Sequence, residues 1–176
     1  MQEEFELTYL IKNFPSAFND AHETKEILDI YIPASAEHAF LRIRKRGDVF
    51  EITKKVLANG TDSSHQIENT IPLTQEEFDD LAQTEGKRVR KIRHYYEENG
   101  IMYEIDVFQD KLEGLVLVDV EFNSNAAKDK FIKPDWFLAD VTQDKLVAGG
   151  VLSGKSYADI EHNLALYNYQ KILIRN

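Results

Sequence analysis

The sequence predicts an α+β fold dominated by antiparallel sheet, with about eight strands and three peripheral helices. Three observations lead to this prediction. Polar and apolar residues alternate with period two in one stretch after another, which places successive side chains on opposite faces of a strand. Turn-forming residue pairs separate these stretches, and few segments carry the start signals of a helix.

The predicted strands are the alternating stretches, at residues 4–9, 41–46, 50–56, 66–71, 91–95, 103–108 and 118–122. The stretch from Ile27 to Ile32, which leads into Pro33, is predicted as a further strand, whereas residues 15–24 fit no single element. Asn99-Gly100 joins two of the stretches and signals a tight hairpin, because both residue types tolerate positive φ. Asn59-Gly60 and Glu113-Gly114 mark two further turns.

Three segments are predicted as helices. Thr74 and Glu77 have the spacing of a capping box, which opens a helix that continues to Leu81. A second short helix is expected over residues 125–131, ending before a proline. A third is expected to begin near Ser156 and to run toward Leu166.

Length and composition describe one ordinary globular domain, expected over residues 1–176. The chain has 31 acidic and 21 basic residues, and its net charge of −10 argues against broad nucleic-acid binding. The absence of Cys excludes disulfides, thiolate zinc sites, iron–sulfur clusters and Cys nucleophiles. The acidic start lacks the pattern of a signal peptide, and no apolar run approaches the ~20 residues that span a bilayer. We therefore expect a cytoplasmic monomer or homodimer with neither nucleic acid nor membrane as a partner.

The charged residues of the alternating stretches segregate by sign along the chain. The acidic pairs are Glu4/Glu6, Glu104/Asp106 and Asp119/Glu121, and the basic pairs are Arg42/Arg44 and Lys91/Arg93, with mixed stretches at Glu51/Lys55 and Gln66/Glu68. In an ordinary half-buried sheet such a face is simply exposed to water, and this alternative stays open. If the sheet closes, with helices covering the apolar outside, about eight strands leave a lumen wide enough for one small ligand.

A lumen lined by both signs of charge has a specific chemical use. Hard divalent cations such as Mg²⁺ take carboxylate oxygens as ligands. Arg and Lys side chains bind phosphate oxygens through charge-assisted hydrogen bonds. Carboxylates that face bases across a narrow tunnel are therefore suited to a complex of a metal ion with a polyphosphate.

The order of these motifs resembles the CYTH superfamily, the triphosphate tunnel metalloenzymes, which includes class IV adenylyl cyclases, thiamine triphosphatases and inorganic triphosphatases. EFELT at residues 4–8 resembles the family's Glu-x-Glu-x-Lys strand except at its last position. LRIRKRGDVFEITKK at 41–55 resembles its Arg-x-Arg and Thr-x-Lys strands, and KIRHYY at 91–96 its Lys-x-Arg-Tyr element. YEIDVFQDKLEGLVLVDVEF at 103–122 and PDWFLADVTQDK at 134–145 resemble two further family segments, so the resemblance covers nearly the whole chain.

The resemblance implies a closed eight-stranded antiparallel barrel with a triphosphate tunnel, peripheral helices and Mg²⁺ or Mn²⁺ as cofactor. The metal ligands that it implies are Glu4, Glu6, Asp106, Asp119 and Glu121. The triphosphate-binding residues that it implies are Arg42, Arg44, Lys55, Lys91 and Arg93, and we add Lys155 as a candidate. The catalytic residues would be Glu4, Glu6, Lys55 and Asp106.

The sequence departs from the family pattern at three positions: Thr8 replaces a Lys, Gln66 replaces an acid, and Asp119 stands where Glu is usual. A hydroxyl in place of an ammonium group loses one charge-assisted hydrogen bond, about 1.5–3 kcal/mol. Three responses remain open. Lys155 compensates, the substrate is smaller or differently placed, or the protein binds without much turnover.

The segment from Gly149 to Ser156 has the letters of a P-loop, but residues 144–148 make a poor buried strand and the chain lacks βαβ alternation. We therefore favour a glycine-rich closure that brings Lys155 near an anion. Taken together, the motifs predict divalent-metal-dependent hydrolysis of a linear triphosphate, inorganic or organic. A class IV adenylyl cyclase and a non-catalytic polyphosphate- or nucleotide-binding protein remain the alternatives.

Overall fold

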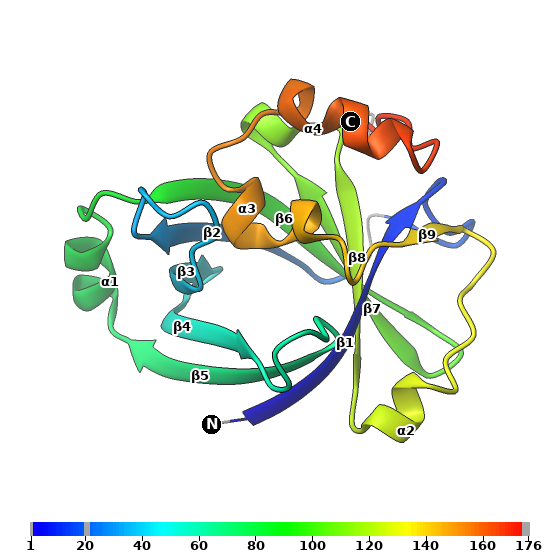
Figure 1. The fold of residues 1–176 in the computed structure, drawn as a ribbon, viewed down its shortest axis with the longest axis horizontal. Coiled ribbons are helices and arrows are strands. Elements are labelled where there is room, and N and C mark those ends of the chain that lie inside the picture. The colour runs from blue at the N-terminus through cyan, green and yellow to red at the C-terminus, as the bar shows by residue number, and fades with distance from the viewer. Residues whose placement is uncertain (1, 20–21, 174–176) are drawn as a thin grey trace.

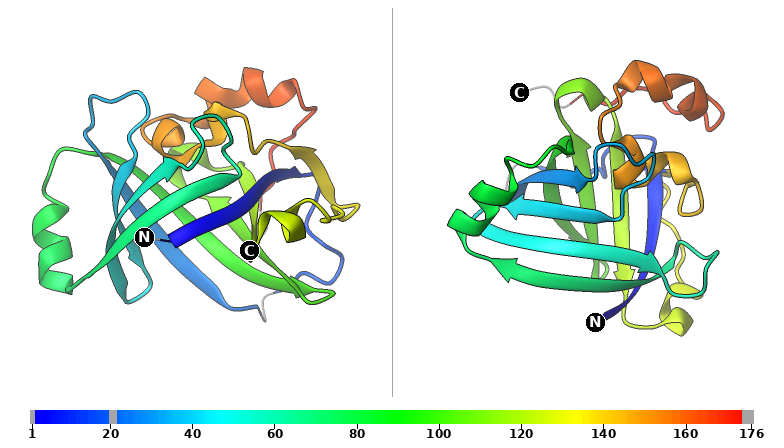
Figure 2. Two further views of the ribbon diagram at one scale, coloured as in Figure 1. Left: turned by 60° about the horizontal axis from the view of Figure 1, so that its bottom comes forward. Right: turned by 60° about the vertical axis from the view of Figure 1, so that its left-hand side comes forward.

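The strands form one antiparallel sheet that closes on itself. The computed structural model describes residues 2–19 and 22–173. The strands follow in the order β5-β4-β3-β2-β6-β7-β8-β1, and β1 also pairs with β5, which closes the barrel (Figures 1 and 2). The predicted eight-stranded barrel with peripheral helices is confirmed. Its strands are β1 (Gln2–Ile11), β2 (Thr24–Ile32), β3 (Leu41–Arg46), β4 (Val49–Leu57), β5 (His65–Leu73), β6 (Lys87–Glu98), β7 (Ile101–Phe108) and β8 (Val116–Phe122).

A ninth strand, β9 (Phe137–Asp140), extends the sheet beside β1 (Figure 1). One edge of β1 pairs with β8, whereas its other edge pairs first with β5, over residues 2–5, and then with β9, over residues 9–11. Between these two neighbours the backbone of β1 is bonded by loops: the amide of Glu6 donates to the Ser64 carbonyl at 3.1 Å, and that of Thr8 to Thr142 Oγ1 at 3.0 Å. The sequence did not predict β9, because four residues are too few to show alternation.

The helices are short and lie outside the barrel wall or at its end (Figures 1 and 2). The capping box that opens α1 (Gln75–Leu81) is confirmed, since Thr74 and Glu77 each bond the other's backbone amide. α2 (Asn125–Lys128) ends three residues before the predicted end, because Phe131 packs into an aromatic cluster instead of continuing the helix. α3 (Gly149–Leu152) was not predicted, whereas α4 (Tyr157–Ala165) lies within the range expected for the third helix. Across the described residues, no helix combines the length and the apolar character needed to cross a membrane.

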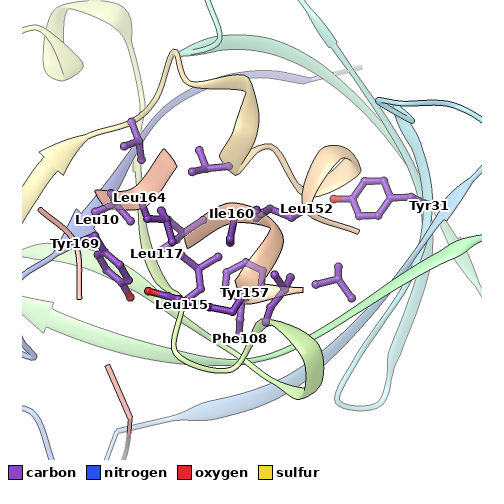
Figure 3. Close-up of a cluster of buried hydrophobic side chains, with 14 of the residues drawn as sticks. Leu10, Tyr31, Phe108, Leu115, Leu117, Leu152, Tyr157, Ile160, Leu164 and Tyr169 are labelled. Carbon is purple, nitrogen blue, oxygen red and sulfur yellow. The ribbon is translucent and has the colours of Figure 1, made fainter. Parts of the chain in front are cut away.

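The buried apolar side chains leave the middle of the lumen to charged residues. Two clusters lie on the outer face of the wall, one around Trp136 and Phe137 and the other between β2, β3 and α1. The third cluster fills one end of the barrel, where inward-facing residues such as Leu117 meet Leu152 of α3 and Ile160 of α4 (Figure 3). The C-terminal segment therefore closes one end of the lumen with apolar side chains.

Candidate active site

A cavity of about 900 Å³ occupies the lumen. Its walls are the inward-facing residues of the strands, together with the segment from Thr142 to Val151. All eleven predicted site residues line it: Glu4, Glu6, Arg42, Arg44, Lys55, Lys91, Arg93, Asp106, Asp119, Glu121 and Lys155. The charged residues of the alternating strands therefore face the inside of the barrel and not bulk solvent.

The basic wall is formed by β2, β3 and β6, and Arg44 at its centre makes two hydrogen bonds to one buried carboxylate. Arg44 Nε donates to Asp29 Oδ1 at 2.6 Å, and Nη2 donates to Oδ2 at 2.8 Å. The two residues lie directly opposite each other in the β2–β3 register. Burial alone would raise the pKa of Asp29, but Arg44 and Arg42 outweigh it and hold that pKa well below its usual value.

Arg42 is held more loosely than Arg44. Its guanidinium lies 3.4 Å from the Tyr31 hydroxyl and 3.8 Å from a Glu68 carboxylate oxygen. Its Nε is buried and has no hydrogen-bond partner among the residues that the structure describes. Because a buried N–H without a partner is costly, this atom is free to donate to a bound anion.

On the far side of β2, the residues of β6 and β7 form a dense ion-pair network. Arg93 donates from Nε to Asp106 Oδ1 at 2.7 Å and from Nη2 to Oδ2 at 2.6 Å, and it also contacts Glu104 and Asp119. Lys91 binds Asp106 as well, so both oxygens of that carboxylate are engaged. Burial favours a raised pKa for Asp106, yet Arg93 and Lys91 lower it to about 2.

The acidic wall is formed by β1 and β8, where Glu6 lies opposite Glu121 and Thr8 opposite Asp119. The Thr8 hydroxyl donates to Asp119 Oδ1 at 2.8 Å. Burial and the Glu6 carboxylate, assisted by Asp106, raise the pKa of Asp119 to about 6. Thr8, at the position where the family pattern has Lys, therefore holds one of the predicted metal ligands in place.

Lys55 of β4 connects the two kinds of wall across the β1–β5 seam. Its ammonium group lies 2.5 Å from Glu4 and 3.4 Å from Glu68. Burial alone would lower the pKa of Lys55, but the surrounding Glu6, Glu4 and Glu68 carboxylates raise it overall. Lys55 points inward and its neighbour Lys54 is exposed, as the alternation predicts.

The C-terminal segment brings Lys155 to the cavity, as predicted, but not in a P-loop. A 3₁₀ turn (Lys145–Val147), and not a buried parallel strand, precedes Gly149. The sheet is antiparallel at every pairing of the described strands. The glycines serve close packing instead, because a Cβ on Gly150 would lie 2.1 Å from the Ala39 carbonyl oxygen.

The donor chemistry of the acidic wall fits a hard divalent cation. Carboxylate oxygens are the ligands that Mg²⁺ and Mn²⁺ take in proteins. Burial first, and then the Glu6 and Asp106 carboxylates, raise the pKa of Asp119 against the opposing effect of Arg93 and Lys91. Over residues 2–19 and 22–173 no three acidic or histidine side chains are gathered closely enough to hold a metal ion. The carboxylates are thus a set of donors, several of which are engaged by cations of the facing walls.

Six acids in or beside the cavity were not among the predicted site residues: Glu37, Glu51, Glu68, Glu104 and Asp144 line it, and Asp29 is buried in the basic wall. Asp29 lies in the stretch Ile27 to Ile32, which was predicted only as a strand because its other residues are mostly apolar. Glu104 was visible as half of the Glu104/Asp106 pair, and this pairing was the signal that could have assigned it to the cavity. Its role as a partner of Arg93 depends on strand register, which the sequence does not display.

Comparison with known proteins places the chain in a family. No protein-family model matches it. It is 36% identical over 143 residues to the inorganic triphosphatase of Nitrosomonas europaea, covering 81% of this chain and 91% of that protein. The crystal structure of an inorganic triphosphatase superposes with a TM-score of 0.62 at 31% identity, over 87% of this chain and 95% of that chain.

A more distant structure shares the fold. A Bacillus halodurans protein proposed to be an adenylate cyclase superposes with a TM-score of 0.53 at 12% identity, covering all of this chain and 96% of that chain. The identity to the Nitrosomonas europaea protein extends over most of both chains, and the barrel carries the predicted charged walls. The chain belongs to the CYTH superfamily, together with the inorganic triphosphatase of Nitrosomonas europaea.

Proposed function

We propose that this protein hydrolyses a phosphoanhydride bond of a linear triphosphate inside the barrel, with inorganic tripolyphosphate as the first candidate substrate. One observation carries the proposal: a wall of Arg and Lys side chains faces a wall of carboxylates across one cavity of about 900 Å³. The kinship with inorganic triphosphatases supports the same reaction and favours the inorganic substrate. The substrate would be a small molecule, and a monomer or a homodimer stays the prediction for the oligomeric state.

The charge balance of the cavity supports a requirement for a divalent metal ion. Among the described lining residues there are ten carboxylates and eight Lys or Arg side chains. A polyanion entering a lining with excess negative charge needs additional positive charge beside it. Glu4, Glu6, Asp119 and Glu121 would hold Mg²⁺ or Mn²⁺, which would neutralise charge on the phosphoryl oxygens. Asp106, the fifth predicted ligand, already has both oxygens bound by Arg93 and Lys91.

The protein's own side chains bind and orient the substrate. Arg42 has a buried Nε without a partner in the described structure, and Arg44, Lys55 and Lys155 line the same cavity. Together they would grip the phosphate chain and fix its terminal phosphorus. A carboxylate of the acidic wall, with Glu6 the first candidate, would orient the attacking water and accept its proton as the anhydride oxygen leaves.

The experiment that tests this function measures phosphate release from tripolyphosphate with Mg²⁺ or Mn²⁺. We expect turnover in the wild type and its loss in Glu6→Gln, which removes an inward carboxylate. Glu3→Gln is the matched control, because Glu3 lies on the same strand with its side chain 65% exposed. Phosphate release no greater than background in the wild type would contradict the hydrolase function.

One observation keeps the binding-protein alternative in view. Thr8 occupies the position of a family Lys, and its hydroxyl is engaged by Asp119, so it offers no cation to a phosphate. Calorimetry that detects tight tripolyphosphate binding without turnover would favour a binder. The same assay with ATP separates a cyclase, which would release pyrophosphate and cyclic AMP.

A further inference from the structure

Asp29 occupies an unusual position on the basic wall. It lies on the inner face of β2 and is 2% exposed. Among the described buried residues of β2, β3 and β6 it is the only carboxylate, and it is surrounded by Arg42, Arg44 and Lys91. A carboxylate at the centre of three cations offsets the repulsion that would otherwise push them apart.

The bond between Asp29 and Arg44 fixes the direction of the guanidinium. Two parallel N–H···O contacts, of 2.6 and 2.8 Å, use both carboxylate oxygens and two of the three guanidinium nitrogens. This bidentate geometry adds directional specificity to the attraction between the charges. Arg44 is 6% exposed and lines the cavity, so Nη1 is the nitrogen outside the pair that can serve a ligand there.

Arg42, which has no such bidentate partner, is held less firmly than Arg44. Arg42 lines the same cavity from the same strand, yet its contacts are 3.4 and 3.8 Å long and its buried Nε has no partner in the described structure. One arginine of the pair is thus fixed before a ligand arrives, and the other has donors to spare. A fixed donor meets a ligand in a set orientation without an ordering cost, whereas a buried donor without a partner gains a hydrogen bond when a ligand arrives.

We propose that Asp29 is a positioning residue for the triphosphate site, which holds Arg44 so that one guanidinium nitrogen meets the phosphate chain in a set orientation. The proposal rests on the proposed triphosphatase function. It assigns a role in catalysis to a residue that does not touch the substrate. Asp29 acts through Arg44. Its loss therefore lowers turnover in the same way as loss of Arg44, by removing the oriented contact with the phosphate chain.

A double-mutant cycle tests the proposal, using Asp29→Asn, Arg44→Gln and the double variant. We expect Asp29→Asn to lower kcat for tripolyphosphate by roughly ten- to a hundred-fold, the cost of a misplaced group, with a much smaller change in KM. The double variant should be no less active than Arg44→Gln alone, because residues that act as a unit are not additive. Additive losses, or a kcat for Asp29→Asn within twofold of the wild type, would overturn the proposal.

Asp110→Asn is the matched control. Asp110 makes the same bidentate pair with Arg90, at 2.9 and 2.7 Å, but both side chains are on the exposed surface. This variant should retain the wild-type kcat and KM. If it loses turnover as Asp29→Asn does, the effect belongs to Asp–Arg pairs in general and the proposal is wrong.

Asp29→Glu keeps the proposal testable if the Asn variant does not fold. It retains the buried negative charge but moves the carboxylate by one methylene group, so we expect a folded protein with lowered kcat. Full activity of Asp29→Glu would mean that only charge, and not position, matters, and would also overturn the proposal. If the wild type binds tripolyphosphate without hydrolysing it, the proposed function fails separately. The same cycle is then measured by calorimetry, where non-additive losses in Kd support the Asp29–Arg44 unit and additive losses refute it.

Discussion

Arg42 carries the donor of the cavity wall that is best placed to gain a bond from a ligand. Its buried Nε has no partner in the part of the chain that the structure describes. We expect Arg42→Gln to raise KM for tripolyphosphate by roughly 10- to 100-fold, equivalent to about 1.5–3 kcal/mol for a charge-assisted hydrogen bond. Steady-state kinetics measure this, with Arg90→Gln on the exposed face of β6 as the control. An unchanged KM would mean that Arg42 does not bind the phosphate chain.

Asp119 should make the metal-free protein less stable as the pH rises. Its folded-state pKa is about 6, above the ordinary value of an Asp carboxyl, because of burial and the nearby Glu6 carboxylate. An acid with a raised folded-state pKa binds more protons in the native state, so its stabilising contribution is lost as the pH rises from about 4 through 6. Thermal unfolding with a chelator, compared between the wild type and Asp119→Asn, measures it. The wild-type Tm should fall relative to that of the variant across this window, and parallel curves would contradict the prediction.

At the level of single residues, the sequence predicted which side chains face the lumen better than it predicted which residues they bind. The alternation placed Glu6, Arg44 and Lys55 inside the barrel correctly, because period two is imposed by the strand backbone itself. It could not predict that Arg44 binds Asp29, 15 positions away, since that contact depends on the register of β2 against β3. Arg93 shows the same limit, because strand pairing decides that carboxylates surround its guanidinium.

The seating of α3 depends on two adjacent glycines that differ in what surrounds them. A Cβ on Gly150 would meet the Ala39 carbonyl oxygen at 2.1 Å, and a Cβ on Gly149 would meet the Tyr31 hydroxyl at the same distance. Backbone cannot move aside as easily as the far end of a side chain. We therefore expect Gly150→Ala to destabilise the fold by about 1–3 kcal/mol, the range of overpacking, and Gly149→Ala by less. Thermal or denaturant unfolding of the two variants measures the difference, and equal losses would contradict this account.

Among the elements, those with strong local signals were predicted and those made by tertiary contacts were not. The capping box of Thr74 and the hairpin at Asn99-Gly100 were correct, since each is determined by a few adjacent residues. α3 and β9 have four residues each and no periodicity to detect. They form because the barrel offers them a surface: β9 pairs with the free edge of β1, and α3 packs against Ala39.

For the molecule as a whole, the excess of carboxylates in the cavity predicts how binding depends on metal. Calorimetry of tripolyphosphate should give tight binding with Mg²⁺ or Mn²⁺ present and a Kd weaker by at least roughly tenfold with a chelator, because the lining then repels the polyanion. Pyrophosphate, with fewer charges, is the matched comparison and should depend less on the metal. Equal tripolyphosphate affinity with and without metal would mean that the basic wall alone suffices.

Because β1 pairs with three later strands, the site cannot form until most of the chain has been synthesised. β1 emerges from the ribosome before β5, β8 and β9, so its edges must stay unpaired until those partners arrive. Unpaired strand edges invite pairing with other chains. A nascent chain that stops before Phe122 therefore lacks β8, has no closed barrel, and exposes unpaired strand edges that can aggregate. The cavity and its charged lining form at the same stage, after most of the chain has been translated.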